Sequence, residues 1–220
     1  MSSEPGLRER KKERTRQLIG ETAQRLFSER GFEAVTVAEV AQAADVSVGT
    51  VFNYFPTKEE LFYSGMEAFE EQLLEAVRER PAAQSVLAAF RRFVLERSSR
   101  LAVEESADVI ASAARVIDAS PALHARERQV VAESTDALAD LIVQEQGARA
   151  STVEAWAVAN ALMGVQRALV AHVRARVLAG VRGRGLAAEV KAEGKRAFAR
   201  LEAGLGDYAA RPRKAVNEAR

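Results

Sequence analysis

The sequence contains no cysteine, which excludes disulfide scaffolds, thiolate zinc sites and cysteine nucleophiles. Long apolar runs are also missing: the longest uncharged stretches, 46–57 and 155–166, have twelve residues each and are too short to span a bilayer. The first ten residues are polar and carry no apolar signal core. Charge of one sign is not in surplus, since 32 Lys and Arg face 31 Asp and Glu, and this argues against a general polyanion binder. We therefore expect a soluble, cytoplasmic protein with no membrane partner.

Aromatic residues are scarce, at 6%, whereas 48% of the 220 residues are hydrophobic. Alanine, leucine, valine, glutamate and arginine dominate, and this composition favours helices over sheets. Apolar periodicity and capping residues predict helices near residues 8–30, 37–44, 47–55, 57–80, 82–97, 101–118, 122–146, 152–179 and 186–205. No segment is typical of a strand. The predicted fold class is all-α.

No catalytic arrangement stands out in the sequence, and nothing in it points to a Ser/His/Asp assembly, although residues distant in sequence leave that alternative open. The two histidines, His124 and His172, lie in different predicted helices, without an HExxH pattern or carboxylates at metal-ligand spacing. Gly183 and Gly185 lack the preceding strand and the third glycine of a dinucleotide-binding fingerprint. We predict no catalytic residue, no metal site and no cofactor, and the protein is not expected to be an enzyme.

The window 37–54 has the pattern of a helix-turn-helix. Thr36 and Glu39 form a capping box at its start, and the small Ala41 lets a second helix approach. Asp45 occupies the turn, where glycine is more usual, and aspartate can adopt left-handed geometry there. Apolar residues fill the angle between the two helices: Val40, Ala44, Val46 and Val51.

The second helix of this window carries small or hydrogen-bonding groups on its outer side, as a helix that enters the DNA major groove requires. Gly49 permits close backbone approach, and Asn53 can pair with an adenine edge. The alternative is an ordinary small helix with solvent-facing polar residues. The predicted recognition residues are Ser47, Val48, Gly49, Thr50, Asn53 and Tyr54.

The run from Thr36 to Phe62, preceded by 23–27 and by Gly31 and Phe32, resembles the TetR family of repressors over about residues 14–66. The resemblance implies a three-helix DNA-binding domain, a linking fourth helix, and a variable helical domain for ligand binding and dimerisation. We place these domains at 8–56 and 57–206, followed by a basic, disordered tail at 207–220.

Position by position, the resemblance assigns phosphate contacts to Thr36, Tyr54 and Lys58. It assigns the recognition helix to Ser47, Val48, Gly49, Thr50 and Asn53. Two residues depart from the family pattern, because Val48 replaces a common lysine and Phe52 a common tyrosine. Each departure removes a phosphate-binding group. The leading arm 8–16, with six cations and two acids, can supply other contacts, among which we predict Arg14.

The predicted helix 152–179 is apolar on two sides, so we expect both sides to be buried. One stripe has the composition of a ligand pocket, and Arg167 within it needs an acidic partner such as Glu104, Glu105 or Asp108, or an anionic ligand. The predicted ligand-binding residues are Phe90, Phe93, Trp156, Asn160, Met163 and Arg167.

In the TetR family the last two long helices commonly build a four-helix dimer interface. On that resemblance we assign the second stripe of 152–179 and part of the last helix to a homodimer interface. The alternative is that both stripes belong to the core of a single chain. The predicted interface residues are Leu162, Val165, Leu169, Phe198, Leu201 and Leu205.

The leading functional hypothesis is a homodimeric transcriptional repressor that a small hydrophobic inducer releases from a palindromic, double-stranded DNA operator. A second hypothesis is a helical enzyme or small-molecule carrier with a vestigial helix-turn-helix. A third, an architectural DNA protein, conflicts with the modest charge and the large apolar second half.

Overall fold

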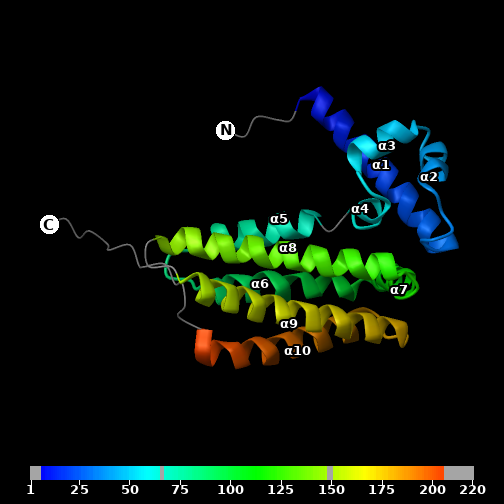
Figure 1. Cartoon of the computed structure of the whole chain (residues 1–220). Helices are drawn as coiled ribbons and strands as arrows, with labels where there is room; N and C mark the ends of the chain where they lie inside the picture. The colour runs from blue at the N-terminus through cyan, green and yellow to red at the C-terminus, as the bar shows by residue number, and fades with distance from the viewer. Residues whose placement is uncertain (1–5, 65–66, 148–150, 206–220) are drawn as a thin grey trace. The chain divides into compact units, whose positions relative to one another are not determined.

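The computed structural model describes residues 6–64, 67–147 and 151–205, and all regular elements in these ranges are helices, as predicted. The chain divides into two units (Figure 1). Unit 1 comprises Met1–Ala68 and Ser112–Glu127, and unit 2 comprises Phe69–Ala111 and Arg128–Arg220. Unit 1 therefore includes chain beyond residue 56, where the sequence places the domain limit. The predicted tail 207–220 lies outside the described residues.

Unit 1 is built around one apolar core. Its helices are α1 (Leu7–Arg30), α2 (Val37–Ala43), α3 (Val48–Tyr54) and α4 (Lys58–Phe62), joined by the end of α7 (Glu104–Asp118) and the start of α8 (Pro121–Gln146). Every one of these helices contributes to the core, whose members include Ile19, Phe27, Val40, Val51, Leu61, Ile117 and Leu123. The Tyr63 hydroxyl donates to the Leu123 carbonyl over 3.1 Å and ties the end of α4 to α8.

The turn between α2 and α3 has the geometry that the sequence predicts. Asp45 has a φ of 53°, in the left-handed region that few residues other than glycine adopt. Its backbone N–H donates to the Gln42 carbonyl, and that of Val46 donates to the Ala41 carbonyl over 3.0 Å. The capping box of Thr36 and Glu39 is also present at the start of α2. These local signals fix where both short helices begin and end.

The prediction of one helix over 57–80 is wrong. The helix α4 ends at Phe62, Tyr63 and Ser64 form a turn, and α5 (Glu67–Arg78) follows. Tyr63 is buried in the core of unit 1, so packing fixes the chain at this point. The sequence here, Ser64 and Gly65, has low helix propensity, and this signal could have predicted the break.

Unit 2 is a bundle of long helices. It contains α5, α6 (Val86–Arg97), the 3-10 helix η1 (Ser98–Ala102), α9 (Thr152–Leu178), α10 (Gly183–Leu205) and the remaining parts of α7 and α8. Figure 1 shows α9 and α10 side by side, and α10 also packs against α6 and η1. A Cβ on the buried Gly194 would lie 2.6 Å from Leu95 Cδ2, so glycine allows this close approach of α10 to α6.

A buried arginine in unit 2 joins the segment after α5 to the end of α8. Arg80 is 2% exposed, and its guanidinium donates to the carbonyls of Val77 and Gln84. Its Nη2 lies 2.6 Å from the Glu145 carboxylate at the end of α8. Burial of a cation is costly unless it is paired, and these contacts provide the pairing.

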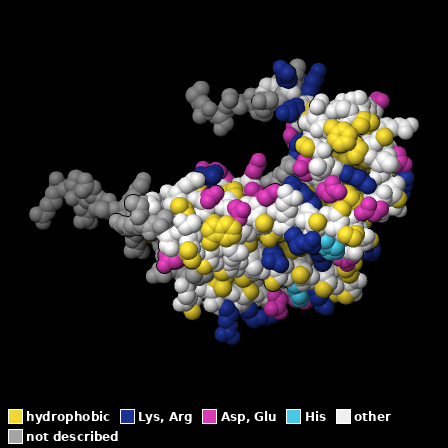
Figure 2. All heavy atoms as spheres, viewed as in Figure 1, with side chains coloured by type: hydrophobic (Ala, Val, Ile, Leu, Met, Phe, Trp, Pro, Cys, Tyr) yellow, Lys and Arg dark blue, Asp and Glu magenta, His cyan; other side chains and the backbone are white. Residues whose placement is uncertain are grey.

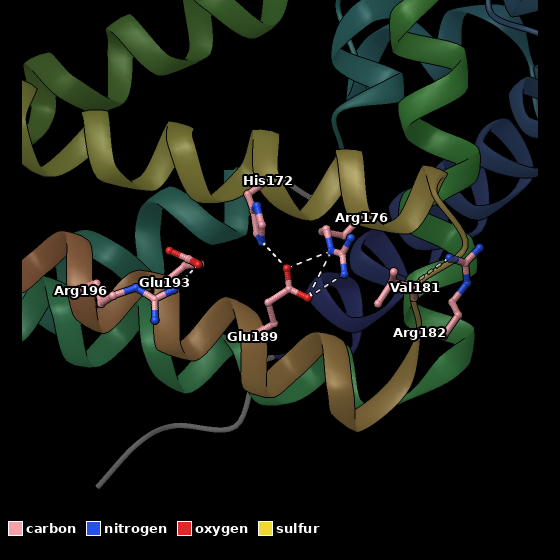
Figure 3. Close-up of polar contacts among 7 residues, drawn as sticks. All are labelled: His172, Arg176, Val181, Arg182, Glu189, Glu193 and Arg196. Atoms are coloured by element: carbon pink, nitrogen blue, oxygen red, sulfur yellow. Dashed lines mark hydrogen bonds and ion pairs between the residues drawn. The ribbon is translucent and has the colours of Figure 1, made fainter.

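A polar group on α10 holds α9 in place (Figure 3). The Glu189 carboxylate lies 3.0 Å from His172 Nε2 and 2.9 Å from Arg176 Nε, and both partners come from α9. Loss of solvation raises the pKa of Glu189, but the hydrogen bonds and charges of Arg176 and His172 outweigh this effect, so the pKa is lowered. The contact is partly exposed, so it orients the two helices more than it stabilises them.

Among the described residues, no helix is long and apolar enough to cross a membrane. The same residues contain no group of three or more His, Asp or Glu side chains that could hold a metal ion.

The positive φ of Asp45 leads to a stability prediction. We expect Asp45→Val to lower the free energy of unfolding by about 1–2 kcal/mol, because a β-branched side chain is strained in the left-handed region. We expect Asp45→Gly to have a smaller effect, because glycine adopts this φ without a steric cost. Urea unfolding followed by circular dichroism measures both. Gln42→Val, at an exposed helical position of α2, is the control. An equal loss for Gln42→Val and Asp45→Val would contradict the role of φ.

Candidate nucleic-acid interface

The outer face of α3 is open to solvent. Val48, Gly49, Phe52 and Asn53 are exposed, whereas Val51 is buried in the core of unit 1. Figure 2 shows hydrophobic side chains at the surface over α3. A short helix with one buried side and one open side is the arrangement that a recognition helix needs.

The hydroxyl groups at the start of α3 are already used within the protein. Ser47 is the N-cap, and its Oγ accepts from the Thr50 backbone N–H over 3.0 Å. The same Oγ lies 2.8 Å from Thr50 Oγ1, so the two hydroxyls share a hydrogen bond. Their main contribution is therefore to begin the helix, and either hydroxyl must give up a partner before it can contact a base.

Gly49 and Asn53 lie one turn apart on the open face. A Cβ on Gly49 would meet only Ser47 Oγ, at 3.8 Å, so no packing within the chain requires glycine at this position. Glycine leaves the backbone of α3 bare and lets another surface come close. Asn53 is exposed, and its side-chain amide makes no hydrogen bond to another described residue. It can therefore offer a donor and an acceptor together.

A charged network fixes the start of α2. The Glu39 carboxylate accepts from the backbone N–H and the hydroxyl of Thr36, each over 2.8 Å, and from Arg30 Nη2 over 2.8 Å. These hydrogen bonds, led by the one from the Thr36 backbone, lower the pKa of Glu39 to about 2. Thr36 is exposed, but its hydroxyl is engaged with Glu39 and must be released before it can bind a phosphate.

Two cations link α3 and α4 to the core through aromatic rings. The guanidinium of Arg16 lies 4.7 Å from the ring centroid of Phe55 and donates to the Tyr54 carbonyl over 3.2 Å. Lys58 Nζ lies 4.3 Å from the ring centroid of Phe32. Tyr54, the last residue of α3, and Lys58, the first residue of α4, are both half-buried. Sequence reasoning did not predict the ring contacts, since it had no means to pair residues this far apart.

The leading arm is helical and forms the first turns of α1. Arg14 and the preceding cations Arg8, Arg10, Lys11 and Lys12 are exposed. Figure 2 shows Lys and Arg side chains near the start of α1. The arm has a net positive charge, because residues 8–16 contain six cations and two acids.

Residues 19–64 match the family described as bacterial regulatory proteins, tetR family. The chain belongs to the TetR family. The match covers α2, α3, α4 and the second half of α1, which are the elements that hold the open face of α3. TetR-family regulators are not enzymes.

Two curated relatives extend this result. The chain is 33% identical over 147 residues to the HTH-type transcriptional regulator TcmR of Streptomyces glaucescens. This match covers 65% of this chain and 65% of TcmR. The chain is also 44% identical over 55 residues to the HTH-type transcriptional repressor KstR of Rhodococcus jostii, covering 25% of this chain and 26% of the relative. The chain thus spans less than two thirds of the length of these relatives.

Two solved structures share the fold. NalD of Pseudomonas aeruginosa, the secondary repressor of the MexAB-OprM multidrug efflux pump, has a TM-score of 0.54 and 21% identity, and covers 85% of this chain and 95% of its own. The fatty acid degradation regulator FadR of Bacillus halodurans has a TM-score of 0.53 and 18% identity, and covers 89% of this chain and 97% of its own. These likenesses extend the TetR fold to the second half of the chain.

The structure does not bring the six predicted ligand-binding residues together. Phe90 and Met163 are buried in the core of unit 2, whereas Trp156, Asn160 and Arg167 are exposed on α9. The expectation that Arg167 is buried is therefore wrong, and this residue needs no acidic partner. Trp156 is 42% exposed, and Asn160 donates to the Trp156 carbonyl within the same helix.

Phe93, the sixth of these residues, is half-buried and packs against Phe69, with ring centroids 5.5 Å apart. The Arg97 guanidinium lies over both rings, 5.0 Å from Phe69 and 5.5 Å from Phe93. Loss of solvation, together with the charge of Arg100, lowers the pKa of Arg97. Sequence reasoning missed this cluster because its members come from two helices, α5 and α6.

The dimer assignment needs a correction for three residues. Leu162, Leu169 and Phe198 are buried within the single chain, so their side chains have no surface left for a partner. This is the alternative in which the stripe belongs to the core. Val165 and Leu201 are half-buried, and the side chain of Leu205 lies outside the described part.

Sequence reasoning missed the side of α9 that is exposed. We call it the small-residue stripe, and it consists of Ala157, Ala161, Gly164, Ala168, Ala171, Ala175 and Leu178. All are exposed except the half-buried Ala161, and they recur at intervals of four and three residues. This spacing is visible in the sequence and could have predicted the stripe, but alanine is common on buried and exposed surfaces alike.

The low pKa of Glu39 predicts a pH dependence. Because the folded pKa of about 2 lies below the ordinary value of 4.5, the carboxylate stabilises the folded state fully above about pH 5. This stabilisation is lost as the pH falls from there through about 2. We expect Glu39→Gln, which retains a capping oxygen, to flatten the decline of the melting temperature between pH 6 and 3. Glu13→Gln on α1, at an exposed carboxylate, is the control. An unchanged pH profile for Glu39→Gln would contradict the prediction.

Proposed function

We propose that the protein is a transcription regulator that binds a palindromic DNA operator as a homodimer and leaves it when a small hydrophobic molecule binds unit 2. The observation that carries this proposal is the open face of α3 on a core that holds it rigidly. The start of α3 is capped, its inner side is buried, and no described residue covers its outer side. We also propose that the protein is located in the cytoplasm, because the operator DNA lies there.

The charges around α3 support binding to DNA rather than to an apolar partner. The exposed cations of α1, Arg14 among them, can neutralise phosphates. In this proposal the half-buried Tyr54 and Lys58 contact the DNA phosphates, and the exposed Asn53 contacts base edges. The net charge of +1 is small, so binding depends on this local arrangement rather than on a general attraction.

The proposal predicts different effects for base and phosphate contacts. We expect Asn53→Ala to cost about 1–3 kcal/mol on the operator and to relax the preference at one base pair. We expect Lys58→Met, which keeps an apolar stem over Phe32, to weaken operator and random DNA alike and to reduce the salt slope by about one. Fluorescence anisotropy with an operator selected from a random duplex library, at several salt concentrations, measures both.

Lys191→Met, at an exposed lysine of α10 in unit 2, is the matched control and should change neither quantity. An equal loss on operator and random DNA for Asn53→Ala would contradict its contact with a base. A wild-type protein that selects no sequence would contradict the regulator itself and favour the alternative of a vestigial helix-turn-helix.

We further propose that the small-residue stripe is the seam of the homodimer, with the half-buried Val165 and Leu201 at its margins. Small residues at intervals of four and three let two helices pack closely along their length. A Cβ on Gly164 would meet nothing within 4 Å, so this glycine, which weakens a helix interior, has no packing reason within one chain. A second helix packed against it would supply the reason. Two copies then double the number of base contacts.

This seam predicts the effect of a charge placed within it. We expect Ala168→Glu to convert a dimer into a monomer at micromolar concentration, because two carboxylates would face each other across the seam. The exposed Ala168 leaves the fold of one chain intact, which circular dichroism checks. Ala132→Glu, the same change at an exposed alanine of α8, should remain dimeric. Sedimentation measures the mass, and a dimeric Ala168→Glu protein would place the seam elsewhere.

The proposed inducer site lies in unit 2. Small-molecule sites are mostly apolar with a few polar groups that fix orientation. The aromatic cluster of Phe69 and Phe93 with Arg97 has this composition, and it supports a site in unit 2 better than the exposed Trp156 and Arg167 do.

A further inference from the structure

Two apolar side chains occupy the face of α3 that is expected to meet the bases. Val48 is 40% exposed and Phe52 is 46% exposed. They are four residues apart in one helix, so they lie on the same side, one turn from each other. Gly49 and Asn53, the residues that follow Val48 and Phe52, are also exposed and lie beside this apolar pair.

Neither side chain is needed by the core of unit 1. That core is complete without them: it includes Val51 and Phe55 from the inner side of α3. A large apolar side chain exposed on a helix that also presents Gly49 and Asn53 is informative, because polar residues would keep this surface in water equally well.

Hydrogen-bonding groups are few on this face. The hydroxyls of Ser47 and Thr50 bind each other, and Gly49 has no side chain. Asn53 is the one exposed residue of α3 whose side chain can form hydrogen bonds and makes none to another described residue. A single asparagine can identify one base pair, so the remaining selectivity of the helix must come from contacts of another kind.

We propose that Val48 and Phe52 recognise thymine through its 5-methyl group, so that each operator half-site carries thymines beneath them. This inference rests on the proposed function and names the base chemistry that the same site reads. Thymine is the one base with an apolar group in the major groove, and it is the natural partner of an apolar side chain there. One helical turn advances about 5.4 Å and neighbouring base pairs are about 3.4 Å apart, so the two side chains reach thymines on neighbouring base pairs.

Replacement of thymine by deoxyuracil tests the proposal, because it removes the methyl group and leaves base pairing intact. Operators selected from a random 30-base-pair library would be resynthesised with uracil at one thymine at a time. For the wild-type protein, we expect uracil at one or two positions of each half-site to weaken binding by about three- to fivefold per methyl group. Uracil at the other thymines should have no effect.

The side chains responsible are identified by combining both changes. We expect Val48→Ala and Phe52→Ala each to weaken binding to the thymine operator and each to lose the response to uracil at its own position. Asn53→Ala should bind more weakly but keep the uracil response. Val109→Ala, at an exposed valine of α7, is the matched control and should behave as the wild type. All four positions are exposed, and circular dichroism checks that the variants fold.

The outcomes separate this inference from the proposed function. A wild-type protein that selects an operator but binds its fully uracil-substituted form equally well overturns the thymine contact and leaves the regulator standing. The same holds if Val48→Ala and Phe52→Ala both retain the full uracil response. A wild-type protein that selects no DNA sequence overturns both.

Discussion

A helix of seven residues forms too few hydrogen bonds to be stable alone, and α3 is such a helix. It exists in this protein because Val51 and Phe55 are buried in unit 1, and because Ser47 caps its first turn. Each buried side chain contributes about 1.5–3 kcal/mol, more than the helix could gain by itself. The core therefore sets the orientation of α3. The residues that α3 buries determine which of its faces stays open to solvent.

The same dependence explains how polar groups are distributed in unit 1. Thr36, Glu39 and Arg30 satisfy one another at the start of α2, and Arg16 joins α1 to the carbonyl at the end of α3. Groups used in this way hold the two short helices at a fixed angle. The groups left over are Asn53, the bare backbone at Gly49 and two apolar side chains, and these determine the chemistry of the exposed face. Some residues of this short segment thus hold the helices in place, and others form the exposed face of α3.

Unit 2 differs, because its long helix α9 has apolar residues on several sides. Leu162, Leu169 and Phe198 are buried in its core, and α10 packs closely against α6 at Gly194. What remains exposed on α9 is the small-residue stripe, with Arg167 and Trp156 beside it. A surface of alanine and glycine costs little when exposed to water and permits close contact with another helix, so it suits a chain that folds first and pairs afterwards.

The sequence by itself determined the features that depend on neighbouring residues. The capping box at Thr36, the left-handed Asp45, the all-helical fold and the resemblance to the TetR family all rest on signals that lie within a few turns of one another. The tertiary structure alone decided which side of α9 is buried and which aromatic rings contact Arg16, Lys58 and Arg97. The physical reason is that helical periodicity shows which residues share a side, but a helix that is apolar on several sides does not show which side its neighbours cover. Burial there is a property of residues distant in sequence, and only their packing in space assigns it.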